Sequence, residues 1–504
     1  MNLIPQGPAS SYDYWCTWNT QYTSLSSFAG GEEGVVQVRN NLNEKLLFDS
    51  PGIISKYFNK CRNDLYVVFD DGWDVDYNQN PGKNISAFGS CKLSEKRFPS
   101  CNGNPAERLK KLDTMVKSLG WKGAGLWISA QAEGEKRGAE FDISYLEKYW
   151  RERAKWCNYA GINYWKVDWG IHAHDMEFRR MLTKIAKEEA PLLKVEHAYC
   201  MGPFNSPDTK DGRFSSSGDW LNKNVDVLSF SDILRTYDVT SELSAASTID
   251  RVSELLSNQK MESGCDGILN VEDELYLGAA LGCIVGVMRH PIWNESIIPD
   301  EGNRRLRIDE IVRTVRWHRI APPYGVWMNK FHKSKEILCD NWFFDKTYDW
   351  AGVEFKSENQ SAPMAISRGM DIPEVIAPND KPFVVASKNP ISGAVSIATI
   401  PRTYLGRGLT IPSADITIEV DGINTIIGIF GEYRSLTIDF SESVEGMDVW
   451  AQDLSTDEAL KITDRIHMDG HHITLDGKTI KEIGTLGATP GDFSYPGLAL
   501  VLKK

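Results

Sequence analysis

Apolar runs and amphipathic stretches alternate along the first two thirds of the chain. The runs end in polar or charged residues and fall at 12–19, 64–69, 120–128, 161–170, 192–197, 224–238 and 267–275. Stretches with apolar residues at helical spacing fall between them, at 105–119, 143–158, 176–189 and 241–258. Strand and helix in alternation are typical of βα units in a parallel barrel. A small-residue, apolar run at 278–288 is the last part of this pattern.

The pattern changes beyond about residue 340. Helical spacing gives way to β-branched alternation between turn residues, as at 394–400 and at 416–420, which Asp421-Gly422 follows. Short strands at near-regular spacing predict an antiparallel sandwich of roughly 120–160 residues. The sequence therefore predicts an α/β fold: a (β/α)8 TIM barrel over 1–340, then a C-terminal antiparallel β-sandwich domain over 341–504, with a boundary uncertain by about 20 residues.

Composition narrows the classes of partner. The 504 residues carry a net charge of −13, which argues against nucleic acid, since phosphate neutralisation needs basic patches. No stretch approaches the roughly 20 apolar residues of a membrane span. The 16 Trp, 18 Tyr and 19 Phe suit a neutral ligand such as a sugar, although most aromatic side chains fill cores.

The cysteines and the first residues of the chain give expectations about disulfide bonds and cellular location. Nine cysteines without C-x-x-C spacing make a closed disulfide framework or a zinc site unexpected. Cys91 and Cys101, in a polar insertion, are the one pair predicted as a local bridge. The chain starts without a basic segment followed by an apolar one, so no secretory signal is present. We expect a cytoplasmic protein, or a secreted or periplasmic one whose signal has been removed.

The run 161–170 delivers a carboxylate to a strand's carboxyl end, where barrels place catalytic groups. Lys166 lies two residues before Asp168, so both side chains point to one face of an extended strand. A cation there could hold Asp168 ionised, as a nucleophile requires. The alternative is an Asp that caps the next helix, with Lys166 as its ion-pair partner.

Two adjacent carboxylates, Asp70 and Asp71, close the run at 64–69. Burying them together is costly because like charges repel, unless each accepts hydrogen bonds from ligand hydroxyls. The alternative is a solvated acidic turn. The sixth unit offers two further acids, Asp232 and Asp238, and the cation Arg235.

Six segments, in this order, resemble motifs of the α-galactosidase clan, glycoside hydrolase families 27 and 36. They are Trp15-Cys16-Thr17-Trp18, Phe69-Asp70-Asp71-Gly72-Trp73, Arg97-Phe98-Pro99, Gly125-Leu126-Trp127, Tyr164-Trp165-Lys166-Val167-Asp168 and Asn270-Val271-Glu272-Asp273. The resemblance covers most of residues 12–288 and is closer to family 27. Each motif alone is weak, whereas six in order are hard to obtain by chance.

The resemblance implies a role for each strand-end residue. Asp168 would be the nucleophile, and Asp70 and Asp71 would bind the sugar's 4- and 6-hydroxyls. The remaining substrate contacts implied are Trp18 and Trp127 as walls around the ring, Lys166 and Arg235 as hydrogen-bond donors, and Glu196 facing the 2-position.

The sequence departs from the family 27 pattern in two places. Trp169-Gly170 follows the nucleophile where a Cys is usual, and Val195-Glu196-His197-Ala198 replaces C-E-W-P, which puts recognition at the 2-position in doubt. For the acid/base, family 27 order favours Asp238 and family 36 favours Asp232. We prefer Asp238, because an Arg closely followed by the acid reproduces the family 27 order.

The expected function is that of a retaining exo-glycoside hydrolase, which removes terminal α-D-galactose from oligo- or polysaccharides through a glycosyl-aspartate intermediate. A β-L-arabinopyranosidase and an α-galactosyl transglycosylase are alternatives on the same site, and a non-catalytic carbohydrate-binding protein is the alternative of another class. No cofactor or metal is expected, since His172, His174 and His197 lack metal-ligand spacing. The sequence does not specify the oligomeric state.

Overall fold

We describe the protein from a computed structural model of the whole chain. The structure describes residues 1–23, 29, 31–49, 52–79, 85–138, 141–200, 204, 218–236, 245–289, 306–342, 358–404 and 408–504.

Eight parallel strands form the barrel. They are β1 (Tyr14–Cys16), β2 (Tyr66–Phe69), β3 (Gly123–Ile128), β4 (Tyr164–Val167), β5 (Lys194–Ala198), β6 (Ile233–Arg235), β7 (Ile268–Asn270) and β8 (Gly286–Val287). Each strand from β1 to β6 pairs with the next in the chain, and β1 also pairs with β8. A parallel bridge between Asn270 and Ile284 joins β7 to the chain just before β8. The (β/α)8 barrel predicted from the sequence is thus confirmed.

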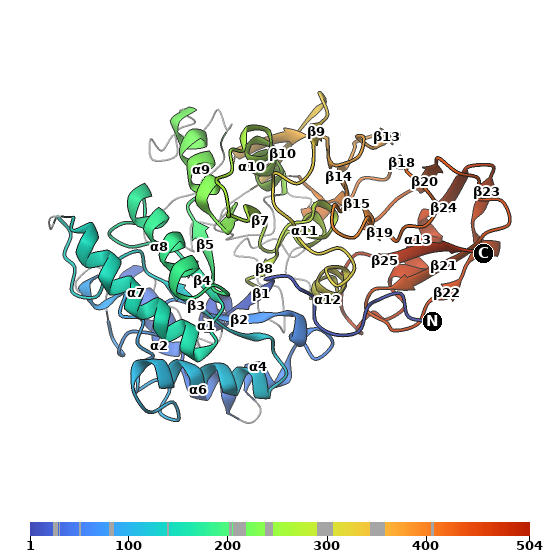
Figure 1. Cartoon of the computed structure of the whole chain (residues 1–504). Coiled ribbons are helices and arrows are strands. Elements are labelled where there is room, and N and C mark those ends of the chain that lie inside the picture. The colour runs from blue at the N-terminus through green and yellow to red at the C-terminus, as the bar shows by residue number, and fades with distance from the viewer. Residues whose placement is uncertain are drawn as a thin grey trace.

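Helices connect the strands and surround the barrel (Figure 1). The short α1 (Trp18–Thr23), α2 (Gly31–Asn41), α3 (Glu44–Phe48) and α4 (Ile53–Lys56) precede β2, and α6 (Pro105–Ser118), α7 (Ile143–Ala160), α8 (Met176–Glu189), α9 (Gly218–Phe230), α10 (Ala245–Asn258), α11 (Leu275–Leu281) and α12 (Asp309–Trp317) follow in order. Local sequence sets several helix ends. Asn104 and Glu107 form a capping box at the start of α6, and α7 stops at Gly161, whose φ of 81° favours glycine.

The sixth unit differs from the pattern seen in the sequence. Residues 224–230 belong to the second half of α9, and β6 is only three residues long. Leu221, Val225 and Leu228 are four and three residues apart, so the same apolar residues also fit helical spacing. A short apolar run fits both periods, and here packing against the barrel selects the helix.

Tyrosines fill the amino-terminal half of the barrel interior. Tyr14, Tyr66 and Tyr164 are buried in one cluster, and the ring of Tyr12 stacks on Tyr66 with centroids 6.0 Å apart. The Tyr14 and Tyr164 ring centroids are 5.2 Å apart. These rings occupy the barrel interior near the amino ends of the strands, whereas α/β barrels bind ligands at the carboxyl ends.

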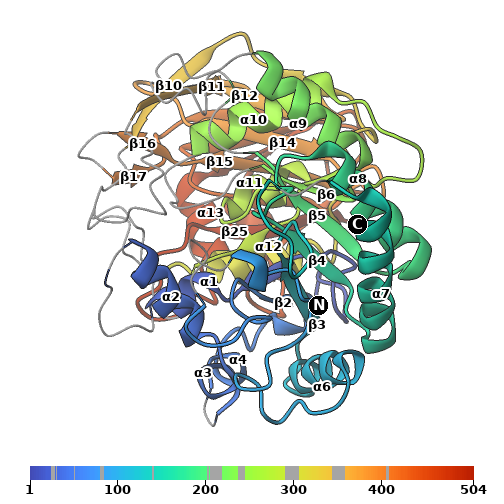
Figure 2. The ribbon, with the colours of Figure 1, turned by 90° about the vertical axis from the view of Figure 1, so that its left-hand side faces the viewer.

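Two packed sheets form the C-terminal domain, which lies behind the barrel in Figure 2. The larger sheet has the order β22 (Leu460–Lys461), β21 (Asp448–Asp453), β25 (Gly497–Lys503), β19 (Ile427–Phe430), β15 (Val395–Ile400), β14 (Phe383–Lys388), β12 (Ala365–Arg368) and β9 (Phe331–Lys333). The smaller has the order β13 (Glu374–Ile376), β18 (Asp415–Val420), β20 (Ser435–Phe440), β24 (His472–Asp476) and β23 (His467–Asp469). Two ribbons, β10 (Ile337–Trp342) with β11 (Glu358–Pro363) and β16 (Arg402–Tyr404) with β17 (Gly408–Thr410), and the helix α13 (Gly477–Gly484) complete it.

The predicted sandwich is confirmed, with one difference in strand direction. Alternate residues of β18 and β20, among them Ile416 and Leu436, face Ile397 and Leu500 of the larger sheet in one core. Most neighbouring strands are antiparallel, but β12 with β14, β15 with β19 and β18 with β20 run parallel. The strand of the larger sheet that comes first in the chain is β9.

The barrel and the sandwich are joined through buried polar contacts. Arg313 of α12 forms a completely buried ion pair with Asp453 of β21, with Nε 2.9 Å from Oδ1. The chain start also packs on the sandwich, since the Leu3 amide donates to the Gln452 side chain at 2.7 Å. Both chain ends accordingly lie on the sandwich side in Figure 1.

The nine cysteines are all free thiols, so the predicted Cys91–Cys101 bridge is wrong. Cys91 lies beside Cys157 of α7, and the Cys101 Sγ is 3.7 Å from the Met115 Sδ. Each cysteine of the insertion therefore packs against a helix instead of its sequence neighbour.

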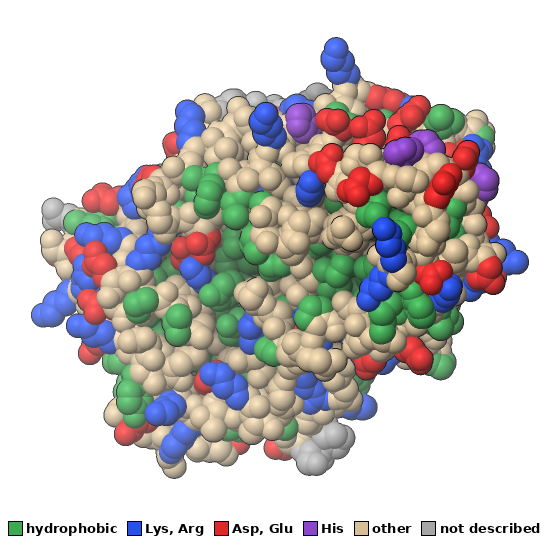
Figure 3. All heavy atoms as spheres, turned by 45° about the vertical axis from the view of Figure 1, so that its right-hand side comes forward, with side chains coloured by type: hydrophobic (Ala, Val, Ile, Leu, Met, Phe, Trp, Pro, Cys, Tyr) green, Lys and Arg blue, Asp and Glu red, His purple; other side chains and the backbone are tan. Residues whose placement is uncertain are grey.

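Charged side chains of both signs are spread over the face shown in Figure 3, with small hydrophobic groups between them. Among the described residues, every helix is too short or too polar to cross a membrane.

Candidate active site

Asp168 lies just beyond the carboxyl end of β4, within a cluster of charged side chains. The Trp127 indole N–H donates to its Oδ2 at 3.0 Å, and Arg235 Nη2 lies 3.5 Å from its Oδ1. The Asp168 side chain is 22% exposed, whereas Arg235 is 2% exposed. Two N–H donors thus stabilise a carboxylate that a ligand can still reach.

Lys166 points into the barrel interior and pairs with Asp70 rather than with Asp168. Its Nζ is 2.7 Å from Asp70 Oδ2, and the Cys16 thiol donates to the same oxygen at 2.8 Å. Burial alone raises the pKa of the Asp70 carboxyl, but Lys166 and these hydrogen bonds hold it below its usual value. The cation nearest to Asp168 is therefore Arg235, which corrects the sequence-based interpretation of Lys166.

The Cys16 thiol belongs to the first of the six motifs, but the resemblance implied no function for it. Burial, followed by the charge of Asp70, raises its pKa well above the usual value, so the thiol stays protonated and acts as a donor. Tyr14 and Cys16 are two residues apart on β1, so both side chains lie on one face of the strand.

Asp71 is engaged by an arginine that the sequence did not single out. Arg39 of α2 donates through Nε and Nη2 to the two oxygens of Asp71, at 2.7 and 2.6 Å. Its guanidinium lies over the rings of Phe88 and Trp169, 4.9 and 5.7 Å from the centroids. Asp71 retains only the oxygen lone pairs that this two-point contact leaves free. No local pattern marks a helical arginine as buried, so only the fold reveals this pair.

Glu196 lies deeper in the barrel than its expected role requires. It pairs in register with Lys166, two residues below the level of Asp168, and it is fully buried. Its carboxylate accepts from the hydroxyls of Tyr14 at 3.2 Å and Tyr164 at 2.7 Å, and from the Asn270 amide at 2.5 Å. Glu196 therefore belongs to the hydrogen-bond network of the barrel interior, and we do not propose it as a substrate contact.

Arg235, the last residue of β6, connects two carboxylates: Asp168 just after β4 and Glu272 just after β7. Besides contacting Asp168, its Nη1 lies 3.3 Å from Oε1 of Glu272, which is fully buried. Glu272 has a φ of 48°, a left-handed conformation that is uncommon for a residue with a side chain. The sequence pattern included Glu272 in a motif, but its ion pair with Arg235 depends on this backbone turn.

The two tryptophans expected as walls are largely covered. Trp127 is 1% exposed and presents its indole N–H to Asp168, and its ring lies 5.3 Å from that of Trp169. Trp18 starts α1 and is 8% exposed, so little of its ring is open to a ligand. Trp127 therefore contacts the proposed nucleophile through a hydrogen bond, and its ring face is not open as a wall for a sugar.

Of the two candidates for the acid/base residue, the structure describes only Asp232. Asp238 lies outside the described residues. Asp232 precedes β6, at the amino end of the barrel, where it accepts from the Val195 amide at 3.1 Å. Ala198 of β5 lies level with Asp168, since it follows His197, the register partner of Val167. Val195 is three residues before Ala198 on the same strand. At about 3.3 Å per residue, Asp232 lies roughly 10 Å further down the barrel than Asp168.

Arg179 of α8 fixes the loop that carries Asp168. It donates to the carbonyl oxygens of Asp168 and Ala198, at 3.1 and 3.0 Å, and contacts His197 Nδ1 at 3.2 Å. Burial and the neighbouring Arg179 lower the pKa of His197 well below its usual value, so this imidazole is neutral. Among the described residues, no group of His, Cys, Asp and Glu could hold a metal ion.

We expect the neighbouring Asp74 to make stability pH-dependent. It accepts from the Cys91 amide at 3.2 Å, and its burial, assisted by Asp71, raises the pKa of Asp74 to about 7. The folded state therefore keeps a proton that the unfolded chain releases above about pH 4. As the pH rises from about 4 to 7, the raised pKa of Asp74 should lower the free energy of unfolding by up to ~4 kcal/mol.

The variant Asp74→Asn, which stays neutral, tests this expectation. Urea denaturation at pH 5 and pH 8 should show the variant gaining stability relative to the wild type at the higher pH. Asp421→Asn, which removes an exposed carboxylate, is the matched control and should show no such change. Parallel pH curves for Asp74→Asn and the wild type would contradict the raised pKa.

No protein-family model matches the chain, and no curated protein matches it either. Solved structures do match. They include a family 27 β-L-arabinopyranosidase from Geobacillus stearothermophilus, at 11% identity and a TM-score of 0.36, covering 99% of this chain and 96% of that one. α-Galactosidase I from Mortierella vinacea matches at 13% identity and a TM-score of 0.37, covering 97% and 96%. A Bacillus halodurans protein provisionally assigned as an α-N-acetylgalactosaminidase matches at 10% identity and a TM-score of 0.41, over the whole of both chains.

These neighbours are glycosidases of the clan that the sequence motifs resemble, or proteins assigned to related activities. The sequence motifs of this chain resemble those of the same clan. At TM-scores below 0.5 the structural similarity supports no conclusion about this chain, and a barrel supports many chemistries. What this chain does is therefore argued from its own side chains.

Proposed function

We propose that this protein is a retaining exo-glycosidase with Asp168 as its nucleophile. The observation that carries the proposal is the contrast between Asp168 and the carboxylates around it. Asp168 is 22% exposed and hydrogen-bonded by Trp127 and Arg235, whereas Asp70, Asp71 and Glu272 have at most 6% exposed side chains and pair with Lys166, Arg39 and Arg235. One reachable carboxylate, hydrogen-bonded by two N–H donors at the mouth of a barrel, suits attack on an anomeric carbon.

The reaction would proceed by double displacement. An oxygen of Asp168 attacks the anomeric carbon, the bond to the leaving oxygen breaks, and the acid, proposed as Asp238, gives that oxygen its proton. In the second step the same residue takes a proton from water, whose oxygen attacks the anomeric carbon and releases Asp168. The sugar leaves with its original anomeric configuration.

Arg39 bears on which sugar the site accepts. Asp70 and Asp71 are proposed to bind the 4- and 6-hydroxyls of a terminal α-D-galactose. However, Arg39 occupies both oxygens of Asp71, which leaves less hydrogen-bonding capacity for a 6-hydroxyl. This observation favours the second candidate, β-L-arabinopyranose, which has the same ring hydroxyls and lacks the 6-hydroxymethyl group.

Hydrolysis of nitrophenyl α-galactoside and nitrophenyl β-L-arabinopyranoside by the wild-type protein tests the proposal. We expect release of nitrophenol from at least one of them, with retained configuration in the first sugar product seen by proton NMR. A higher kcat/KM on the arabinopyranoside would support the effect of Arg39. Transfer of the sugar to added alcohols in preference to water would indicate a transglycosylase. Sugar binding without turnover of any glycoside would reject the enzyme and favour the carbohydrate-binding alternative.

A further inference from the structure

A groove of about 790 Å³ lies at the end of the barrel opposite to Asp168. One side is the end of α10, with Leu256, Ser257 and Gln259, and the other is the stretch from Trp327 to Lys333 that leads into the sandwich. Trp327 contacts Asp266, just before β7 begins, so the groove is at the amino end of that strand. None of the residues proposed for catalysis lines it.

Trp327 is held in place although its side chain is largely open to solvent. It is 55% exposed, yet its indole N–H donates to the Asp266 carbonyl oxygen at 3.2 Å. The turn that carries it is tied to the barrel, because the Val326 amide donates to the Gly267 carbonyl at 3.0 Å. A Cβ on Gly325 would lie 2.2 Å from the Asp266 carbonyl oxygen, so glycine permits this close approach. The ring is therefore presented in a fixed orientation before any ligand arrives.

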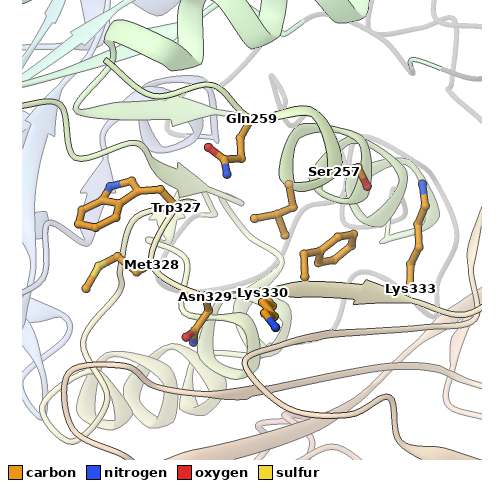
Figure 4. A pocket seen from close by; sticks show the side chains of 9 residues that line it. Ser257, Gln259, Trp327, Met328, Asn329, Lys330 and Lys333 are labelled. Carbon is orange, nitrogen blue, oxygen red and sulfur yellow. The ribbon is translucent and has the colours of Figure 1, made fainter. Parts of the chain in front are cut away.

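Polar side chains extend the groove beyond the ring. Figure 4 shows Trp327 and Met328 toward one end and Lys333 at the other, with Gln259 and Ser257 along the opposite side. Gln259 is half-buried, and no described residue hydrogen-bonds its side-chain amide. Of the two lysines that line the groove, Lys333 is compensated by Glu254, with Nζ 3.0 Å from Oε1.

We propose that this groove is a second carbohydrate-binding site, which holds a neutral stretch of the polysaccharide whose terminal sugars the active site removes. A pyranose ring has one face of C–H groups that packs on an aromatic plane, and an edge of hydroxyls that an amide can both donate to and accept from. Trp327 and Gln259 supply these two functions across an open groove. The choice of a polysaccharide as the occupant rests on the proposed glycosidase function.

Affinity gel electrophoresis with soluble galactomannan and arabinogalactan tests the proposal. The wild-type protein should be retarded by at least one of them, and Trp327→Ala should raise the dissociation constant about tenfold, the cost of losing an aromatic anchor. Gln259→Ala should weaken binding as well, and it removes no hydrogen bond between side chains of the described residues. Tyr159→Ala removes an aromatic residue of α7 that is 56% exposed and should be retarded like the wild type.

Two results would overturn the second site. One is equal retardation of Trp327→Ala, Gln259→Ala and the wild type, or no retardation of any of them. The other is retardation by polygalacturonate alone, which would show that Lys330 and Lys333 bind an anion instead of a neutral glycan. Hydrolysis of the nitrophenyl glycosides by the wild type decides the proposed function separately, since those substrates contain no polysaccharide.

Discussion

Asp168→Ala is expected to lower kcat/KM by about four orders of magnitude or more, as removal of a catalytic group generally does. The reason is that the neighbouring carboxylates Asp70, Asp71 and Glu272 are buried in ion pairs and cannot replace it. Folding should be preserved, because the Asp168 amide, which donates to the Ile128 carbonyl at 2.9 Å, is kept in the variant. The rates are measured with the nitrophenyl glycoside that the wild type prefers.

Azide distinguishes a lost nucleophile from other causes of inactivity. In Asp168→Ala, azide can enter the space of the missing carboxylate, form a C–N bond to the anomeric carbon and expel nitrophenolate. The glycosyl azide should have the configuration opposite to that of the substrate, identified by NMR. A glycosyl azide of retained configuration would instead mark Asp168 as the acid/base residue. Asp448→Ala, which removes a carboxylate of β21 in the sandwich, is the control and should keep wild-type rates.

Lys166→Met is expected to lower the free energy of unfolding by about 3–5 kcal/mol, the cost of breaking a buried ion pair at one partner. The Lys166 and Asp70 side chains are 2% and 6% exposed, so the variant leaves a buried carboxylate that only the Cys16 thiol and backbone contact. We expect activity to fall as well, because Asp70 would take up a proton. The double variant Lys166→Met/Asp70→Asn removes the stranded charge and should recover part of the stability.

The pH dependence of Lys166→Met follows from the direction of the Asp70 shift. In the wild type the pKa of Asp70 is lowered, so its contribution to stability is complete above the unfolded value of about 3.9 and is lost as the pH falls through the folded value. Without Lys166, burial raises the folded pKa above the unfolded one, and stability falls as the pH rises. The deficit of the variant should therefore widen from pH 5 to pH 8 in urea denaturation. An equal deficit in the single and double variants would contradict this account.

If these expectations hold, the site divides into two levels with different tasks. The upper level, with Asp168, Trp127 and Arg235, presents one carboxylate to the substrate. The lower level, with the Lys166–Asp70 pair and the Glu196 network, keeps the polar barrel interior compensated by hydrogen bonds and opposite charge. A variant of the lower level should thus affect stability and activity together, whereas a variant of Asp168 should affect activity alone.

Much of the scaffold could be predicted because it depends on local sequence. Strand and helix periods placed α6, α7 and α8 within two residues of their observed ends, and the strand ends placed Asp70 and Asp168 at the mouth of one barrel. Periodicity failed at α9, where a short run fits both helix and strand. It also failed at Cys91 and Cys101, whose proximity in sequence suggested a bond that the packing against α7 and α6 does not form.

The partners of the charged residues depend on contacts across the barrel, which no spacing in the sequence encodes. Lys166 and Asp168 are two residues apart at the end of β4, yet they have different partners. Closure of the barrel brings Lys166 to Asp70, which follows β2, two strands away. Asp168 instead contacts Arg235 of β6. The stagger of the strands places Glu196 below the site and Asp232 at the other end of the barrel. The sequence by itself determined which strands carry the acids and in what order. Only the tertiary structure decided which acid is open to a substrate, because the depth and pairing of a side chain follow from the curvature and register of the closed sheet.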